Sequence, residues 1–143
     1  MRKILSICLV MLLSVATKAQ TVASLADSSF AKHDYPVAYK YYAEALKSEP
    51  NNIIYLRRAG FSLMNCQGQE LNATRFFAEA IKIKPTDPVA NYYLGLIYLD
   101  AAKAESKTEN KAHFKALAQT YLTNASNYGS SDAKAAIKDL NGI

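Results

Sequence analysis

Residues 73–85 read ATRFFAEAIKIKP, and this stretch decides the fold. Ala73 and Ala80 lie seven residues apart with Phe77 between them, and Pro85 follows five residues after the second alanine. Positions separated by three, four and seven residues fall on one face of an α-helix. The pattern therefore predicts a helix whose small residues let a neighbouring helix approach closely around one bulky apolar side chain.

The same pattern occurs at two other places in the chain. Residues 38–50 read AYKYYAEALKSEP, and residues 118–125 read AQTYLTNA, with Leu122 at the bulky position. The first two copies lie 35 residues apart, from Ala38 to Ala73, which is a period typical of helical-repeat arrays. No stretch alternates apolar and polar residues as a half-buried strand would. The sequence therefore predicts an all-α fold built from repeated helical units.

A second half-pattern precedes each copy and completes the unit. Its residues are Val22, Leu25, Ala26 and Ser29; then Leu56, Ala59, Gly60 and Leu63; then Asn91, Leu94, Gly95 and Tyr98. These are the positions at which the tetratricopeptide repeat family places Trp, Leu, Gly and Tyr. The chain therefore resembles that family over about residues 20–128, and it departs from the pattern most in the first unit, where Ser29 replaces the usual tyrosine.

The resemblance implies a right-handed helical-repeat solenoid of about three antiparallel helix pairs. In each pair, a large residue on the second helix fills the gap that glycine or alanine leaves on the first. The implied repeats span about residues 20–52, 53–87 and 88–130, in one domain over residues 20–143. A capping helix over 131–141 should follow, because its apolar residues share one face and a repeat stack must cover its last apolar face. That face comprises Ala133, Ala136, Ile137 and Leu140.

Short polar residues and glycines mark the expected helix ends. Asp34, Asn51 with Asn52, and Asp87 stand where side-chain oxygens can cap the first N–H groups of a helix. Gly68 and Gly129 mark turns, since glycine accepts the left-handed backbone conformation that ends a helix.

The third unit is longer than the others. Ala73 and Ala118 are 45 residues apart, and the additional segment 101–111 contains helix-forming residues without glycine or proline. We expect both helices of this unit to be prolonged and to meet near residues 106–108. Ser106 and Glu109 fit a capping box for the second of them.

The N-terminal segment, residues 1–19, has the features of a secretory signal peptide. Arg2 and Lys3 precede an apolar run over residues 4–15, and cleavage after Ala19 would leave Gln20 as the new terminus. The run is shorter than the roughly 20 residues that a membrane-spanning helix needs, although retention as an anchor is the alternative. We therefore expect a periplasmic or extracellular protein, in keeping with a bacterial envelope.

The charge of the chain depends on this segment. The whole sequence carries +5, of which Arg2, Lys3 and Lys18 supply three charges, so the processed chain carries +2. Such a small net charge gives no electrostatic reason to expect nucleic acid as the partner.

The residues that could carry chemistry are few and scattered. His33 and His113 fall in different units, and Cys66 is the single cysteine after residue 19, so no intramolecular disulfide is expected. The sequence contains no HExxH, CxxC, GxSxG or phosphate-binding glycine loop. These observations predict a protein that is not an enzyme and that holds no metal or cofactor.

The family resemblance instead implies a concave groove, lined by the first helix of each pair, that binds a partner peptide or protein segment. Carried onto this sequence, the groove would include Ala23, Asp27, Phe30, Arg57, Phe61, Met64, Asn65, Tyr92, Leu96 and Leu99. Aromatic and Met side chains supply contact area, and Arg57 and Asn65 could hydrogen-bond a peptide. Phe61 and Leu96 could equally pack against the neighbouring helix.

The family's carboxylate clamp, which grips C-terminal carboxylates, is not expected. The five positions that it requires hold Ala23, Asp27, Arg58, Val89 and Tyr93. The expected function is therefore a non-catalytic adaptor of the cell envelope that binds an apolar or aromatic peptide segment. The alternatives are a cell-wall glycan-binding protein or a structural component of an envelope complex, and, with less support, a hydrolase.

Overall fold

The structure, a computed structural model, describes residues 21–143, and this part of the chain is entirely helical apart from its turns. The predicted signal peptide over residues 1–19 lies outside the described residues. A first helix spans 21–31. It is followed by α2 (Tyr35–Ser48), α3 (Ile53–Met64), the short 3-10 turn η1 (Leu71–Ala73), α4 (Thr74–Ile83), α5 (Pro88–Ala104), α6 (Thr108–Asn127) and α7 (Ala133–Leu140).

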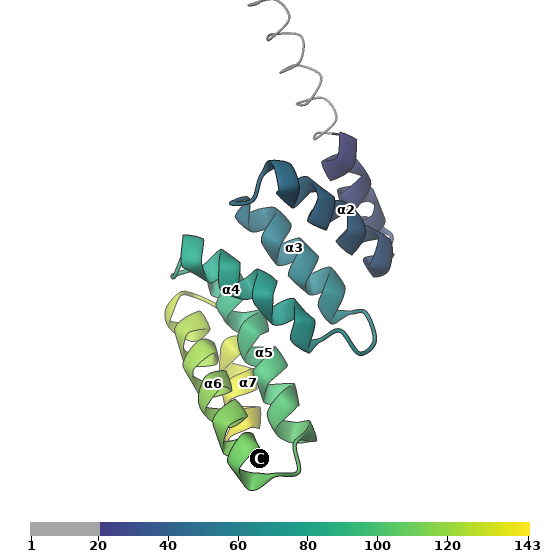
Figure 1. The fold of residues 1–143 in the computed structure, drawn as a ribbon. Helices are drawn as coiled ribbons and strands as arrows, with labels where there is room; N and C mark the ends of the chain where they lie inside the picture. The colour runs from purple at the N-terminus through teal and green to yellow at the C-terminus, as the bar shows by residue number, and fades with distance from the viewer. Residues whose placement is uncertain (1–20) are drawn as a thin grey trace, which may run out of the picture.

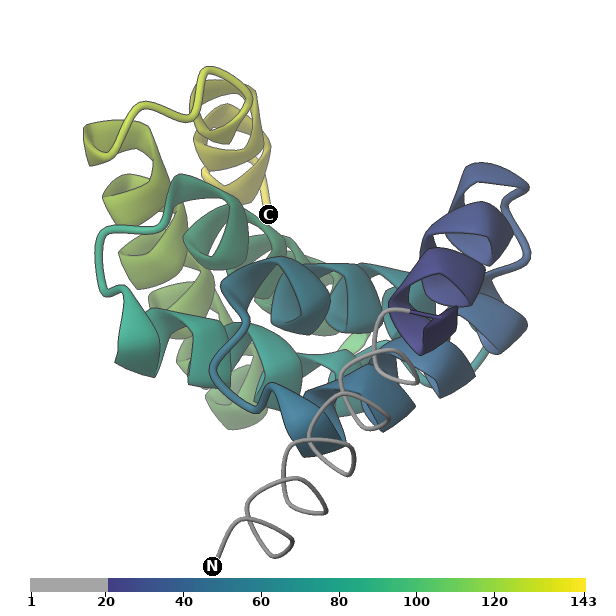
Figure 2. The same cartoon turned by 90° about the horizontal axis from the view of Figure 1, so that it is seen from above.

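Consecutive helices from α2 to α7 pack against one another in chain order, and neighbours run in roughly opposite directions (Figure 1). Seen from above, the helices follow an arc (Figure 2). The helix over 21–31 and α2 form one end of this arc, and α7 belongs to the other. The described chain therefore has an inner side that faces the space between its two ends.

The repeated pattern forms the core of this arrangement. Each of its nine small or bulky residues is at most 3 % exposed. They are Ala38, Tyr42 and Ala45 on α2; Ala73, Phe77 and Ala80 on η1 and α4; and Ala118, Leu122 and Ala125 on α6. The prediction that these positions lie on buried helix faces is confirmed.

Two glycines explain how closely the paired helices approach. A Cβ atom added to Gly60 on α3 would lie 2.9 Å from Cζ of Phe77, and one added to Gly95 on α5 would lie 2.7 Å from Cγ of Leu122. Both distances are shorter than a carbon–carbon contact allows. The bulky residue of the second helix therefore occupies the space that the glycine leaves on the first.

The predicted N-caps are confirmed at three helices. A side-chain oxygen of Asp34, Asn52 or Asp87 accepts hydrogen bonds from the first turn of α2, α3 or α5, and Asn52 alone serves α3. The N–H groups that donate belong to Val37 (3.4 Å), Ile54 (3.1 Å), Tyr55 (3.2 Å) and Ala90 (2.8 Å). These caps satisfy donors that the helix itself leaves free.

Three turn residues between positions 21 and 143 adopt a positive φ. Gly68 (74°) and Gly129 (100°) do so as the sequence predicts. His33, which nothing in the sequence marked for this role, has a φ of 59° and ends the helix over 21–31. Its Nδ1 lies 2.8 Å from the hydroxyl of Tyr35, so the turn also positions an aromatic ring at the start of α2.

The third helix pair is lengthened as predicted. α5 and α6 contain 17 and 20 residues, against 12 and 10 in α3 and α4. The predicted capping box of Ser106 and Glu109 is wrong, because the N-cap of α6 is Lys107 and its side chain makes no capping bond. Glu105 orders this turn instead, since its carboxylate accepts from the Lys107 N–H at 2.9 Å and from Asn110 Nδ2 at 3.2 Å.

The last helix, α7, covers one face of the lengthened pair. It begins at Ala133, slightly later than predicted, and buries Ala133, Ala136 and Leu140. Lys103 Nζ on α5 lies 2.6 Å from Oδ2 of Asp139, which joins α7 to the end of α5. Leu99 and Leu122 share a hydrophobic cluster with α7, so the predicted apolar face of this helix does pack against the preceding pair.

Candidate functional site

A continuous row of aromatic rings runs along the described chain from the first helix to α5. We call Phe30, Tyr35, Phe61, Tyr92 and Tyr93 the aromatic strip. Ring centroids are 5.5 Å apart between Phe30 and Phe61, 5.2 Å between Phe61 and Tyr93, and 5.3 Å between Tyr92 and Tyr93. Most of these rings meet edge to face or tilted, the arrangements that aromatic pairs favour. The strip thus joins the first helix, α2, α3 and α5 through one set of contacts.

The strip lies along two adjoining cavities. The larger, of about 530 Å³, is bounded by the first helix, the start of α2, α3 and the start of α5. It is lined by Phe30, His33, Tyr35, Ile54, Arg57, Arg58, Phe61, Val89 and Tyr93. The smaller, of about 270 Å³, shares Val89 and Tyr93 with it and extends to Ser130, Ser131 and Asp132 before α7. We call the two cavities together the groove.

The groove is mainly apolar, with two arginines at its wall. Arg57 Nη1 lies 3.3 Å from Oδ2 of Asp87, and Asp87 is almost fully buried. The side chain of Arg57 is 28 % exposed. One of its five donor N–H groups is thus held by the protein, and a guanidinium fixed in this way can present further donors to a ligand oxygen.

The second arginine, Arg58, is part of a network that links α2, α3 and the first helix. It donates to the carboxylate of Asp27, and its Nη1 lies 3.3 Å from the hydroxyl of Tyr42. Tyr42 in turn donates to Asp27 at 2.7 Å. Burial and this hydrogen bond to Asp27 raise the pKa of Tyr42, so the phenol stays protonated and remains a donor. The network orders the wall of the groove at the edge where Arg58 lies.

The predicted groove residues fall into several groups. Phe30, Arg57 and Phe61 line the larger cavity, and Tyr92 lines the smaller one. Asp27 stands beside the groove, where it holds Arg58 and Tyr42. Ala23 is buried.

Four further predicted residues lie elsewhere. Met64 lines a separate cavity, and Asn65 caps the end of α3, with its amide donating to the Phe61 carbonyl at 2.8 Å. Leu96 is half-buried against the cluster that includes α7, and Leu99, which is 2 % exposed, belongs to that cluster. Leu99 therefore cannot line an open groove, because α6 and α7 cover it.

The sequence analysis did not predict six of the residues that line the larger cavity. They are His33, Tyr35, Ile54, Arg58, Val89 and Tyr93. Three of them, Tyr35, Ile54 and Val89, lie in the first turns of their helices, next to capping residues that the sequence did identify. A search of each predicted first turn for exposed apolar residues could have found them.

The polar groups that could do chemistry are not assembled into one centre. Over residues 21–143, no group of three or more His, Cys, Asp or Glu side chains is placed to hold a metal ion. His113 is exposed on α6, far along the chain from the His33 turn. Cys66 is half-buried and donates from Sγ to the Ser62 carbonyl at 3.3 Å, and burial raises the pKa of its thiol. A raised pKa lowers the thiolate fraction at neutral pH.

Replacing Asp87 with alanine should lower the free energy of unfolding by about 2 kcal/mol, since it removes both the N-cap of α5 and the partner of Arg57. Asp87→Asn keeps a side-chain oxygen that can accept from the Ala90 N–H. It should therefore lower the free energy of unfolding by only about half as much. Urea unfolding of the two variants compares these contributions. Equal losses would mean that the capping bond contributes nothing.

Comparison with known proteins adds no family assignment: no protein-family model matches the chain, and a search of curated proteins finds no match. Within the described residues, none of the helices combines the length and the apolar character needed to cross a lipid bilayer.

Proposed function

We propose that this chain is a non-catalytic interaction module of the tetratricopeptide-repeat type, and that its groove binds an apolar or aromatic segment of a partner protein. The observation that carries the proposal is the groove itself, in which aromatic rings from successive helices adjoin a partly exposed arginine. Large rigid side chains beside a few fixed donors are typical of protein-binding surfaces.

The repeat architecture is supported by the packing of the glycines. Gly60 faces Phe77 within one helix pair, and Gly95 faces Leu122 within the next. This is the same small-to-large contact at equivalent positions, which is what a stack of repeated units requires. We therefore propose a solenoid of helix pairs in which the groove lies on the inner side of the arc in Figure 2.

The proposed partner supplies one or two large apolar side chains together with an acceptor for Arg57. The larger cavity, about 530 Å³, lies within the range of roughly 300–1,000 Å³ that is common for binding pockets. A backbone carbonyl or a carboxylate of the partner would accept from Arg57. Because the sequence lacks the residues of the family's carboxylate clamp, we propose a partner segment that need not end in a terminal carboxylate.

The proposed location is outside the cytoplasm, in a bacterial envelope, and it depends on the basic and apolar composition of residues 1–19. Mass spectrometry of the protein isolated from its own cells should find Gln20 as the first residue. A chain that still begins at Met1 would contradict cleavage.

A photocrosslinking experiment tests the binding surface. A benzophenone amino acid is placed at Ile54, which is 50 % exposed and lines the groove, or at Ile83, which is 40 % exposed at the end of α4 and lines none of the cavities described here. We expect one dominant protein adduct in the native compartment from position 54 and none from position 83. Equal labelling from both positions would contradict a binding site in the groove.

The matched substitutions extend this test to affinity. Ile54→Glu places a charge on the apolar wall of the groove and should weaken binding of the crosslinked partner at least about tenfold. Ile83→Glu makes the same chemical change outside the groove and should leave binding unchanged. Titration of the purified partner measures both, and a loss at Ile83 as large as at Ile54 would refute the assignment.

Glycan binding is the second candidate, and the same variants separate it from peptide binding. Sugars bind aromatic residues mainly through exposed ring faces, whereas several rings of the strip are engaged with each other edge to face. If the protein is retained on isolated cell-wall material and Ile54→Glu abolishes this retention, glycan binding in the groove is favoured. Retention that neither variant changes would exclude the groove as its site.

A further inference from the structure

A third cavity, separate from the groove, lies where the lengthened α5 extends past the end of α3. Its volume is about 330 Å³, and it shares no lining residue with the groove. Met64 from the end of α3, Leu71 from η1, and Ile97 and Ala101 from α5 give it an apolar lining. Figure 1 shows α5 continuing beyond the turn that joins α3 to α4. The cavity exists because α5, with 17 residues, is longer than α3, with 12. We call it the end pocket.

The end pocket has one exposed apolar residue of large size. Leu71 is 56 % exposed, although it lines the same cavity as the almost fully buried Ile97. An exposed leucine at the mouth of a cavity with an apolar floor offers surface that a partner side chain would remove from water. An apolar group that covers Leu71 at this cavity would therefore gain free energy from the surface removed from water.

The charged residues that line the pocket have a single sign. Glu70 and Asp100 are its two charged lining residues, and neither Lys nor Arg lines it. Among the described residues, neither carboxylate takes part in a salt bridge: Glu70 accepts from the Gly68 N–H at 3.1 Å, and the nearby Lys103 is paired with Asp139. This local charge stands out on a chain whose residues 20–143 carry +2.

We propose that the end pocket is a second docking site, and that its occupant is a partner segment presenting a large apolar side chain next to Lys or Arg. The apolar side chain enters between Met64, Leu71 and Ile97, and the cation lies toward Asp100 and Glu70. A Lys or Arg side chain suits this position because its apolar stem covers the rim while its charged end stays near the carboxylates. The two sites differ in chemistry, since arginines stand at the groove and carboxylates at the end pocket.

The test uses a defined probe and two exposed variants. The probe is a labelled, amidated twelve-residue peptide in which two leucines and two lysines share one helical face, and its control carries glutamates in place of the lysines. We expect fluorescence anisotropy to show binding of the basic peptide, at least about tenfold tighter than that of the acidic one. Binding should weaken as salt is raised, because the carboxylates are exposed to solvent.

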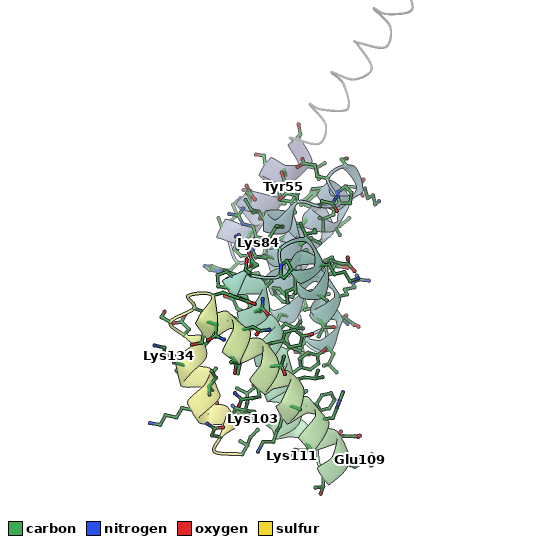
Figure 3. The ribbon with its side chains drawn as sticks, turned by 90° about the vertical axis from the view of Figure 1, so that its left-hand side faces the viewer. Tyr55, Lys84, Lys103, Glu109, Lys111 and Lys134 are labelled. Carbon is green, nitrogen blue, oxygen red and sulfur yellow. The ribbon has the colours of Figure 1, made fainter. Side chains whose placement is uncertain are left out.

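The substitutions locate the binding. Asp100→Lys should weaken binding of the basic peptide about tenfold. Glu109→Lys makes the same change of charge at the start of α6 (Figure 3), at a residue that does not line the end pocket, and should alter binding by less than about twofold. Leu71→Ser tests the apolar contact and should also weaken binding. All three positions are exposed, so circular dichroism should show an unchanged fold.

Three results would overturn the proposal. The first is no binding of the basic peptide to the unaltered protein, and the second is equal binding of both peptides. The third is an equal loss with Asp100→Lys and Glu109→Lys, which would reduce the effect to overall charge. Ile54→Glu, which disables the groove, should leave this binding in place, so that failure at one site is distinguishable from failure at the other.

Discussion

Replacing Phe77 with alanine should lower the free energy of unfolding by about 3–5 kcal/mol, the cost of removing a large side chain from a packed core. Phe77 is fully buried, stacks on Tyr93 with ring centroids 5.5 Å apart, and fills the space above Gly60. Truncation leaves a cavity between α3 and α4 that the helices cannot close without moving. Urea unfolding followed by circular dichroism measures the loss.

The partner substitution at Gly60 makes this prediction specific to the small-to-large contact. In the unaltered protein, Gly60→Ala should destabilise, because its Cβ would meet three ring atoms of Phe77 at 2.9–3.1 Å. In the Phe77→Ala background the ring is gone, and alanine should gain up to about 1 kcal/mol over glycine from its helix propensity. The sign of the Gly60→Ala effect should therefore reverse.

A Gly60→Ala effect of the same sign and size in both backgrounds would contradict a direct contact between these residues. Tyr128→Ala is a suitable control for the loss of an aromatic ring, since Tyr128 is exposed at the end of α6. It should change the free energy of unfolding by less than about 0.5 kcal/mol.

Leu122→Ala should cost about 2–5 kcal/mol, by the same argument applied to the lengthened pair. Leu122 is fully buried and packs over Gly95 at the contact between α5 and α6. Because α7 shares the cluster to which Leu122 belongs, the loss should extend to the docking of the last helix. Hydrogen exchange should then show faster exchange of the amides of α7 than in the unaltered protein.

The second contact differs from the first in one respect that can be measured. A Cβ at Gly95 would also lie 3.1 Å from the backbone nitrogen of Leu122, and this atom remains in Leu122→Ala. Gly95→Ala should therefore stay neutral or slightly destabilising in the Leu122→Ala background, unlike Gly60→Ala in the Phe77→Ala background. If Gly95→Ala instead stabilised the Leu122→Ala background, the backbones of α5 and α6 would be able to separate. The Leu122 side chain alone would then determine how closely the two helices approach.

The buried faces of the helices could be predicted because their periodicity depends on local geometry. Ala38, Tyr42 and Ala45 lie on one side of α2 whichever helix packs against it, and all three are buried in the structure. The N-caps were predictable for a similar reason, since Asp34 and Asp87 act on N–H groups within three residues of themselves. Both kinds of prediction use short distances along the chain.

The turn between α5 and α6 shows the limit of such reasoning. Ser106 and Glu109 have the spacing of a capping box, yet Glu105 supplies the hydrogen bonds that order this turn. The three candidate acceptors lie within five residues, and the backbone path of the hairpin decides which of them reaches an N–H group. The spacing of these residues in the sequence does not determine the path of the backbone.

The groove was predicted in part, and the errors on α5 have one physical cause. Leu96 and Leu99 lie on the part of α5 that packs with α7, whereas Tyr92 lines the smaller cavity and Val89 and Tyr93 face the larger one. Leu96 lies seven residues after Val89 and so on nearly the same face of the helix, but about two turns further along α5, beside the cluster that contains α7. The family pattern alone does not reveal where a terminal helix packs, and here α7 packs against Leu96 and Leu99.

The chain's sequence by itself determined that it forms helices, where most of them begin, which faces they bury, and that the third pair is longer. These properties follow from side-chain periodicity and from capping over a few residues. Only the tertiary structure decided which residues from different helices meet at the surface: the aromatic strip joins the first helix, α2, α3 and α5, and the end pocket joins α3, η1 and α5. Such surfaces depend on the angles at which helices pack, and those angles are set by contacts between residues far apart in the sequence.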